Sequence, residues 1–510
     1  MSTLQLTRRF CASFVPSLEV ALVLAGGLMA GCAVGPDFKR PAAPTVSDYT
    51  DHPLTNTVAT TNSLGGEAQH FTKVGDIAGD WWTLFHSQPL NDLIELALTN
   101  NPDLKAAQAA LTVARENVLT QRGVFYPSVA GSFSASRSKA SELLAPAPNF
   151  PTTPQEFQYN LFTPQVTVSY SPDVFGLNRR TVESVKAQEQ NIRFQMIAAY
   201  TTLTANVVVT AIQSAAVQAQ IDATRQLVDL NSNMVEILRY QYSKGYAGRL
   251  DVVAQESQLA QVTAVLPPLM KQAAQLRDLL AVLAGRFPNQ SPAEKFDLAS
   301  LQLPVGIPVS LPSQLVAQRP DVLQAEANLH AASAQVGVAI ANRLPNITLT
   351  ADAGSTALSL DKVFSSGTGF WGLGAAAMAP IFQGGQLLHQ ERAAKAAFTQ
   401  AAEQYRSTVL TAFQNVADTL AALEQDADGL KAAATAADDA QETLDLSQRQ
   451  YRDGYIGYLA LLSAEQAYQQ ARINLVQAQA NRYADTAALF QALGGGWWHR
   501  ADLTKEKDEK

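Results

Sequence analysis

Residues 177–244 constrain the fold most strongly, because this long stretch contains no glycine and no proline. Alanine, glutamine, leucine and valine dominate it, which favours one continuous helix. At about 1.5 Å per residue such a helix would be roughly 100 Å long, whereas helices in globular domains average about 11–12 residues. The chain is therefore expected to be mainly helical and elongated.

Apolar residues within this stretch occur in adjacent pairs that repeat every seven residues. Leu227 and Val228 are followed by Met234 and Val235. A simple coiled coil needs only one apolar seam, so adjacent pairs indicate two seams and a neighbouring helix on each side. This pattern is expected of a stave in a helical barrel.

The N-terminus has the pattern of a secretory signal, with Arg8 and Arg9 followed by the apolar segment 20–30. The segment ends in Leu-Met-Ala-Gly before Cys32, which is typical of a bacterial lipobox. We therefore expect removal of residues 1–31 and a covalent diacylglyceryl group and N-acyl chain on Cys32. The alternative is an ordinary signal peptide followed by a chance cysteine.

Composition excludes several classes of protein. The net charge is -8 and charged residues make up 16% of the chain, so no basic patch indicates nucleic acid. No apolar run is expected to form a transmembrane helix of the mature chain. The only other cysteine is Cys11 in the signal, so no disulfide is expected. Ala33 stands where an aspartate would favour the inner membrane, which favours an outer-membrane destination. The Pro-, Thr- and Ser-rich segment 32–75 is expected to be an extended, lipid-anchored tether.

The chain contains an internal duplication of about 200 residues. Short motifs recur at an offset of 218 residues in the first part of each copy and at an offset of 209 in the last part. Two motifs in register on each side of a shortened loop indicate a repeat. The recurring pairs are Pro102 and Pro320, Pro127 and Pro345, Gly245 and Gly454, and Glu256 and Glu465.

Both copies are expected to have the same plan: a first helix, a β-hairpin, a long helix and a return helix, with Gly245 and Gly454 in the turns after the long helices. Pro267-Pro268 are expected to interrupt and kink the first return helix. The expected first repeat is 76–285, with a first helix over 90–125, hairpin 127–172, long helix 177–244 and return helix 250–284. After an equatorial connector at 286–311, the second is 312–496, with a first helix over 312–343, hairpin 345–380, long helix 386–453, return helix 459–493, and then a tail at 497–510.

The expected strands alternate with period two. Val166, Val168 and Tyr170, for example, alternate with threonine and serine. One apolar and one polar face suit a membrane barrel with a wet lumen, although a soluble hairpin half-buried on a helix has the same pattern. Four strands cannot close a membrane barrel, which begins at about eight, and a spanning sheet has no free edge. Several chains must therefore share one barrel.

Several short motifs occur in a fixed order and spacing between Cys32 and Trp498. They are Cys-Ala-Val-Gly-Pro-Asp-Phe from Cys32, Trp81-Trp82, Asn101-Pro102-Asp103, Ser171-Pro172-Asp173, Arg319-Pro320-Asp321, Gln383-Gly384-Gly385 and Gly494-Gly495-Gly496. In this order the chain resembles the TolC-like outer membrane factors, specifically the NodT-like lipoprotein subgroup of tripartite efflux systems of the resistance–nodulation–division type.

The resemblance implies a homotrimer, in which four strands from each chain form one outer-membrane β-barrel and the long helices form a periplasmic α-barrel. It implies a lipid-anchored outer-membrane protein that extends into the periplasm. A periplasmic adaptor protein and an inner-membrane pump would dock at its closed tip. Transport would be passive, and drugs, metal ions and other small molecules are not distinguished as substrates.

In this family, links between the two helix pairs hold the tip shut. The resemblance places the acidic partner of the link at Asp251 and the tyrosine at Tyr451. The arginine position falls on Ile456, and the two aspartate positions of the constriction fall on Ala460 and Ser463. The nearby charged residues that could substitute are Arg249, Arg452 and Asp453. Solvated charges beside a helix turn are the alternative interpretation of all of them.

No enzyme motif is present. The six histidines form no HExxH motif, and there is no GxSxG, phosphate-binding loop or Cys/His metal spacing. We therefore expect no enzymatic activity, no cofactor and no metal site. The alternative function is a periplasmic coiled-coil structural or stalk lipoprotein, but duplicated hairpins argue against it because a spacer has no need of them.

Overall fold

A computed structural model of the chain describes residues 33–52, 54–73, 75–140, 157–290 and 296–504. The described residues fall into two compact units, and each unit takes parts of both repeats. The first contains 33–40, 112–190 and 327–403, and the second contains 41–111, 191–326 and 404–504. The compact units therefore do not follow the boundary between the repeats.

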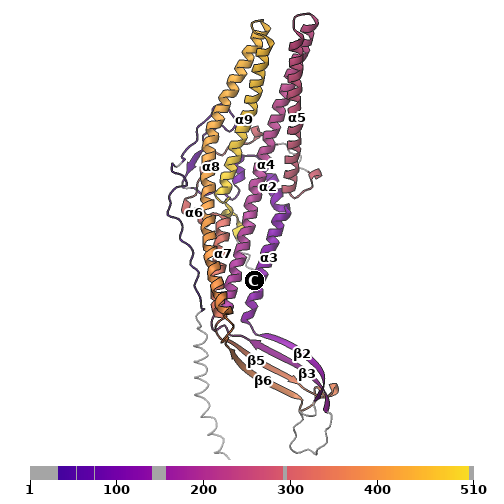
Figure 1. Cartoon of the computed structure of the whole chain (residues 1–510), viewed down its shortest axis with the longest axis vertical. Coiled ribbons are helices and arrows are strands. Elements are labelled where there is room, and N and C mark those ends of the chain that lie inside the picture. Colours follow the sequence, from indigo (N-terminus) through magenta and orange to yellow (C-terminus); the bar gives the residue numbers. More distant parts are fainter. Residues whose placement is uncertain (1–32, 53, 74, 141–156, 291–295, 505–510) are drawn as a thin grey trace, which may run out of the picture. The chain divides into compact units, whose positions relative to one another are not determined.

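Two helix pairs dominate the fold. The long helices α4 (Leu177–Ser243) and α8 (Gln386–Arg452) have 67 residues each, and the return helices α5 (Arg249–Leu283) and α9 (Tyr458–Ala492) have 35 each. Each long helix runs beside its return helix (Figure 1). Equal lengths in the two halves are what a duplicated chain would give.

Small apolar side chains line the inner face of the long helices. Buried residues of α8 recur every three or four positions from Tyr405 to Ala437, and many of them are alanine or valine. In α4, Leu227 and Val235 are buried, whereas Val228 and Met234 are only half-buried. The residues of the second apolar seam expected from the sequence are thus only partly covered by other residues of the same chain.

The expectation that no segment of the mature chain is apolar enough to cross a membrane was wrong. An 18-residue window of α4 is apolar enough to cross a membrane, with mean hydropathy 1.3, and 67% of it is buried within the protein. Length and composition alone cannot distinguish such a window from a core helix. The burial shows that α4 uses this apolar surface for packing.

The first helix of each repeat is divided, contrary to the sequence prediction of single helices. Helix α2 (Gln88–Asn100) is followed by α3 (Pro102–Arg122), and α6 (Pro312–Gln318) is followed by α7 (Pro320–Ala341). The residues between them, Asn101 and Arg319, have ψ angles of 124° and 125°. A residue before proline is disfavoured in the α region, which explains both breaks.

The paired prolines Pro267 and Pro268 do not interrupt the first return helix. Helix α5 continues from Arg249 to Leu283 through both of them. Each proline removes one backbone donor, but the helix is 35 residues long and is held by packing on both sides of the pair. The expectation of an interruption was therefore wrong.

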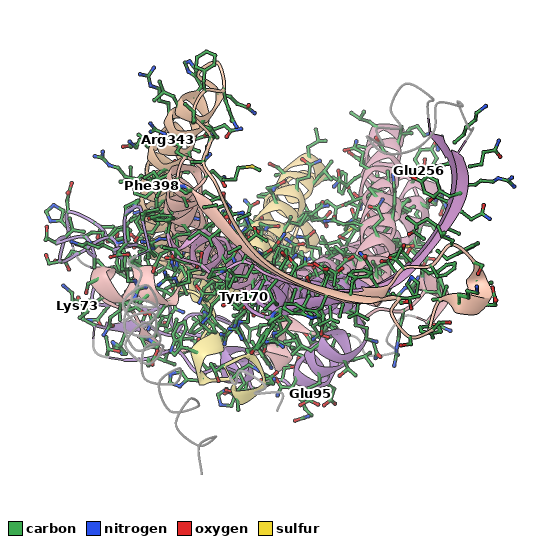
Figure 2. All side chains as sticks on the ribbon, turned by 90° about the horizontal axis from the view of Figure 1, so that it is seen from below. Lys73, Glu95, Tyr170, Glu256, Arg343 and Phe398 are labelled. Carbon is green, nitrogen blue, oxygen red and sulfur yellow. The ribbon has the colours of Figure 1, made fainter. Side chains whose placement is uncertain are left out.

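A four-stranded antiparallel sheet joins the two hairpins. Its strands are β2 (Ser128–Ala140), β3 (Phe157–Tyr170), β5 (Asn346–Ser355) and β6 (Gly369–Met378), in the order β2-β3-β5-β6. The pairing of β3 with β5, with Val168 opposite Ala351, connects the two repeats. Within the described residues, β2 and β6 are edge strands. Tyr170, the last residue of β3, is labelled in Figure 2.

The extended segment before the first repeat packs on α9. Gln69 donates from Nε2 to Thr486 Oγ1 at 2.9 Å, and the buried Arg482 donates to Glu67 O at 2.9 Å. Strand β1 (His70–Thr72) pairs in parallel with β4 (Gly306–Pro308). The remaining short elements are η1 (Trp81–Phe85), η2 (Gly123–Phe125), η4 (Pro288–Gln290), η5 (Leu298–Ser300), η6 (Leu360–Lys362), η7 (Trp497–His499) and α10 (Ala501–Thr504).

Candidate functional site

The two turns between long and return helices have the same geometry. In the first, Gly245 has φ +79°, Gly245 N–H donates to Tyr242 O and Tyr246 N–H donates to Gln241 O. This pair of bonds is a Schellman motif, and glycine is favoured at its left-handed position. Gly454 repeats the motif with the same φ. We call residues 244–248 and 453–457 the tip turns.

Asp251 is held by the start of its own helix. Its Oδ2 accepts the backbone N–H of Gly248 at 3.0 Å, which satisfies one of the free donors at the N-terminus of α5. A carboxylate in the first turn is also favoured by the helix dipole. Local helix capping therefore accounts for Asp251 within one chain.

Tyr451 connects the two repeats. Its hydroxyl donates to Gln241 Oε1 at the end of α4, at 3.2 Å, and its ring packs edge-on against Tyr458 at 6.0 Å. Burial raises the pKa of Tyr451, and the negative charge of Asp251 raises it further. The side chain is half-buried in a cluster with Leu238 and Val252. Tyr451 thus forms its hydrogen bond with Gln241 rather than with Asp251, and the charge of Asp251 affects only the pKa of Tyr451.

The other candidates near the tip turns are exposed. Within the described part of the chain, the side chains of Arg249, Arg452 and Asp453 make no hydrogen bond or ion pair. Ile456 is half-buried, and Ala460 and Ser463, in the first turns of α9, are exposed. In one chain the structure brings together Tyr451, Gln241 and the neighbourhood of Asp251, and leaves the charged residues free to meet other groups.

Sequence reasoning missed a layer of polar side chains between the helices beyond the tip turns, in which Asn231, Gln255 and Gln258 are buried and Gln466 is exposed. Gln466 Nε2 of α9 donates to Gln258 Oε1 of α5 at 2.7 Å. On the same helix, Gln255 Nε2 donates to Asn231 Oδ1 of α4 at 2.9 Å. Buried amides that bond across helices fix the helices in register. Nothing in the sequence identifies these partners, because they lie about 24 or 208 residues apart.

Glu465 is the most unusual member of this layer. It is 1% exposed, and neither carboxyl oxygen has a hydrogen-bond partner within the described residues. Burial raises the pKa of this carboxyl to about 7. The Tyr458 hydroxyl, on the same helix, is likewise buried without a partner. A carboxyl placed in this way is neutral at low pH and is destabilised when it ionises.

The equivalent glutamate of the first repeat has a partner. Glu256, labelled on α5 in Figure 2, accepts from Arg239 Nη2 at 2.8 Å. The position equivalent to Arg239 in the second repeat is Gln448. Comparison of the repeats at the offset of 209 could therefore have identified Glu465 as a glutamate that has lost its cation.

The predicted lipid-attachment residue, Cys32, lies outside the described residues. The segment that follows it is described, and its contacts are given below. Among residues that the structure covers, no group of three or more His, Cys, Asp or Glu side chains could hold a metal ion.

Comparison with known proteins gives one family. A family model for outer membrane efflux proteins matches residues 93–286 and 311–495. Among curated proteins, the probable efflux pump outer membrane protein TtgC of Pseudomonas putida is 28% identical over 496 residues, 96% of this chain and 97% of the relative. The toluene efflux pump outer membrane protein TtgF of Pseudomonas putida is 30% identical over 497 residues, 94% of this chain and 96% of the relative.

A solved structure shows the same fold. The CmeC outer membrane channel of Campylobacter jejuni superposes with a TM-score of 0.82 and 22% identity, covering 92% of this chain and 97% of that one. The subunit fold predicted from the sequence is confirmed: two long helices with their return helices, and four strands in one antiparallel sheet, as in this outer membrane channel.

Proposed function

This chain belongs to the outer membrane efflux protein family, and because it is therefore an outer-membrane efflux channel, we propose that it is the exit duct of a tripartite pump. In this proposal three chains form the channel. A periplasmic adaptor and an inner-membrane pump deliver small molecules, such as drugs, to its periplasmic end. Family membership favours a channel over the stalk lipoprotein considered from sequence.

The open edges of the sheet support this proposal most directly. Strands β2 and β6 are edge strands in the described chain, and large apolar side chains such as Phe133, Trp371 and Leu373 are exposed on it. Unpaired edges are not tolerated in a bilayer, so β2 of one chain must pair with β6 of the next. Three copies of four strands give twelve, which is within the range of membrane barrels.

Transport through such a duct is passive. The chain carries no enzyme motif, and its family is a family of channels, so the driving energy comes from the pump. The pump also selects the substrate. The name of one relative specifies toluene, which supports small organic molecules as cargo without deciding among drugs, solvents and metal ions.

The proposed anchor is a diacylglyceryl and N-acyl lipid on Cys32. The lipobox sequence before this residue supports it, together with the outer-membrane location of the family. The lipid would hold the extended N-terminal segment at the membrane, while the long helices α4 and α8 reach into the periplasm.

The proposed closed state rests on contacts between the repeats near the tip turns. Tyr451 with Gln241, and Gln466 with Gln258, join the second helix pair to the first. A hydrogen bond of this kind contributes about 0.5–1.5 kcal/mol, so a docked adaptor could separate them. Arg249, Arg452 and Asp453 are free to bond to a neighbouring chain or to the adaptor.

Drug susceptibility tests the function. The gene is expressed in a strain that lacks its own outer-membrane efflux channels, together with the adaptor and pump that co-purify with the protein. We expect resistance to return only when all three components are present. Full resistance with the adaptor and pump alone would contradict the proposal.

A further inference from the structure

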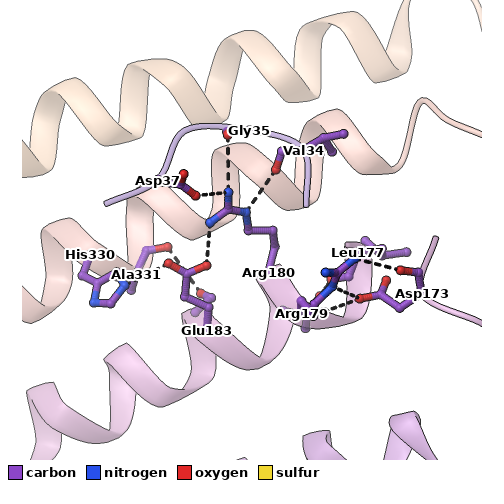
Figure 3. A network of polar contacts seen from close by, with 12 residues as sticks. Val34, Gly35, Asp37, Asp173, Leu177, Arg179, Arg180, Glu183, His330 and Ala331 are labelled. Carbon is purple, nitrogen blue, oxygen red and sulfur yellow. Dashed lines mark hydrogen bonds and ion pairs between the residues drawn. The ribbon is translucent and has the colours of Figure 1, made fainter. Parts of the chain in front are cut away.

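The segment Val34–Phe38 is bound by a single arginine of α4. Arg180 donates from Nε to Val34 O at 3.0 Å, and from Nη2 to Gly35 O at 3.4 Å and to Asp37 Oδ1 at 2.7 Å (Figure 3). We call Val34–Phe38 the strap. We call Arg180, together with the helix side chains that orient it, the clamp. One guanidinium thus binds three acceptors of the strap in its fork of donors.

On the side away from the strap, Arg180 contacts Glu183 of α4, which in turn contacts α7. Arg180 Nη1 donates to Glu183 Oε2 at 2.8 Å, and Glu183 Oε1 lies 3.0 Å from His330 Nε2 of α7. The ring of His330 stacks on Phe38 of the strap, with centroids 4.3 Å apart and planes at 14°. Glu183 therefore orients both groups that bind the strap (Figure 3).

Glycines let the backbones meet without side chains between them. A Cβ on Gly35, where φ is +94°, would lie 2.4 Å from Gly337 Cα of α7. A Cβ on Gly176 would lie 2.5 Å from Ala33 Cα. Val34 N–H also donates to Phe175 O at 3.1 Å. The strap is thus built into the surface at the point where the chain leaves β3 and enters α4.

The clamp requires the strap. The Arg180 side chain is only 5% exposed, and a buried guanidinium needs its hydrogen bonds satisfied. Without the strap it would lose Asp37 and two carbonyl oxygens, and would keep only Glu183. Asp37, by contrast, is 88% exposed, so the arginine side of this contact is the part that is built into the fold.

We propose that the Arg180 clamp is a docking site for the chain's own processed N-terminal peptide, and that it makes the acyl chains of Cys32 enter the bilayer at a fixed point beside Phe175 and Gly176. The lipid is then a positioned part of the membrane junction of the channel, and not the end of a free tether. The lipid half of this inference rests on the acylation proposed above.

Limited trypsin digestion of the full-length protein, extracted from outer membranes in mild detergent, tests the clamp. The reporter bond is Lys39–Arg40, directly after the strap, and its cleavage is followed by mass spectrometry of the released N-terminal peptide. We expect Arg180→Gln to speed this cleavage at least about tenfold, because loss of one charge-assisted hydrogen bond shifts an equilibrium by about that much. Arg179→Gln is the matched control, because Arg179 bonds to Asp173 and not to the strap.

Changes on the strap itself separate release from misfolding. Gly35→Ala removes no charge and changes no residue of a helix, but its Cβ would overlap the Gly337 backbone, so it should speed cleavage as Arg180→Gln does. Heat-modified migration of the variant checks that the barrel still forms. If both variants are cleaved at the wild-type rate, the clamp does not hold the strap and the proposal is wrong.

A photoreactive fatty acid tests the lipid position. Cells are fed a fatty acid with a diazirine near its carboxyl end, and cross-linked peptides are identified after irradiation. We expect cross-links concentrated in residues 171–177 in the wild type and dispersed in Gly35→Ala. Equal distributions would overturn the fixed entry point. An N-terminal peptide without lipid would overturn the acylation instead, while the trypsin result would still decide on the clamp.

Discussion

Glu465→Gln should remove the pH dependence that Glu465 gives to the stability of the helix pair near the tip turns. Glu465 is buried without a hydrogen-bond partner among the described residues, and burial raises the pKa of its carboxyl from 4.5 to about 7. Glutamine has nearly the same shape and remains neutral at every pH. The substitution therefore removes only the cost of ionisation.

The sign follows from the two pKa values. Between pH 4.5 and about 7 the folded state keeps a proton that the open state has lost, so stability falls as pH rises, by up to about 1.4 kcal/mol per pH unit. Above the folded-state pKa the cost is constant. Glu465→Gln should therefore stabilise the closed helix pair by up to about 3 kcal/mol at pH 8, and by less than about 1 kcal/mol at pH 5.

Hydrogen–deuterium exchange of peptides from 458–468 is the appropriate assay. The ratio of wild-type to variant exchange at one pH cancels the intrinsic pH dependence of exchange, and reports the difference in opening free energy. We expect a ratio of up to about 300 at pH 8 and below about 5 at pH 5. Glu256→Gln is the matched control, because Glu256 holds the equivalent place in the first repeat and has Arg239 as its partner.

The reasoning is refuted if the Glu465→Gln ratio is the same at pH 5 and pH 8. It is also refuted if Glu256→Gln gives an equal change, because the effect would then not come from burial of an unpartnered carboxyl.

Two further predictions concern the tip and the anchor. Asp251→Ala combined with Tyr451→Phe removes the cap of α5 and the bond to Gln241, so single-channel conductance in planar bilayers should rise and cells should become sensitive to large antibiotics. Unchanged conductance would place the gate elsewhere, with the ring at Ala460 and Ser463 to be tested next. Mass spectrometry of the mature N-terminus should find a lipid on Cys32, and Cys32→Ala should impair signal processing while pores still assemble. A mature N-terminus at another residue would show that the lipobox interpretation is wrong.

The long helices α4 and α8 could be predicted from the sequence, because helix propensity depends on the residues of the segment itself. The absence of glycine and proline from 177–244 leads directly to α4, which ends within one residue of that range. The division of the first helices was missed, although Pro102 and Pro320 were already recognised as a repeated motif. Proline is tolerated in the first turn of a helix, and here each one begins a second helix.

The polar contacts near the tip turns could be predicted only in part. Asp251 and Tyr451 were located through a family resemblance, but their hydrogen-bond partners depend on how two helix pairs face each other. Gln241 and Gln466 gave no signal, because glutamine is frequent along these helices. Glu465 did carry a signal, since its equivalent Glu256 has a cation that the second repeat lacks.

Native mass spectrometry of the protein released from outer membranes in detergent most directly tests whether three chains build one channel. A four-stranded sheet with two open edges cannot close by itself, so the predicted result is a stable assembly of three copies of the mature chain. A stable monomer, or an assembly of any other number of copies, would contradict it.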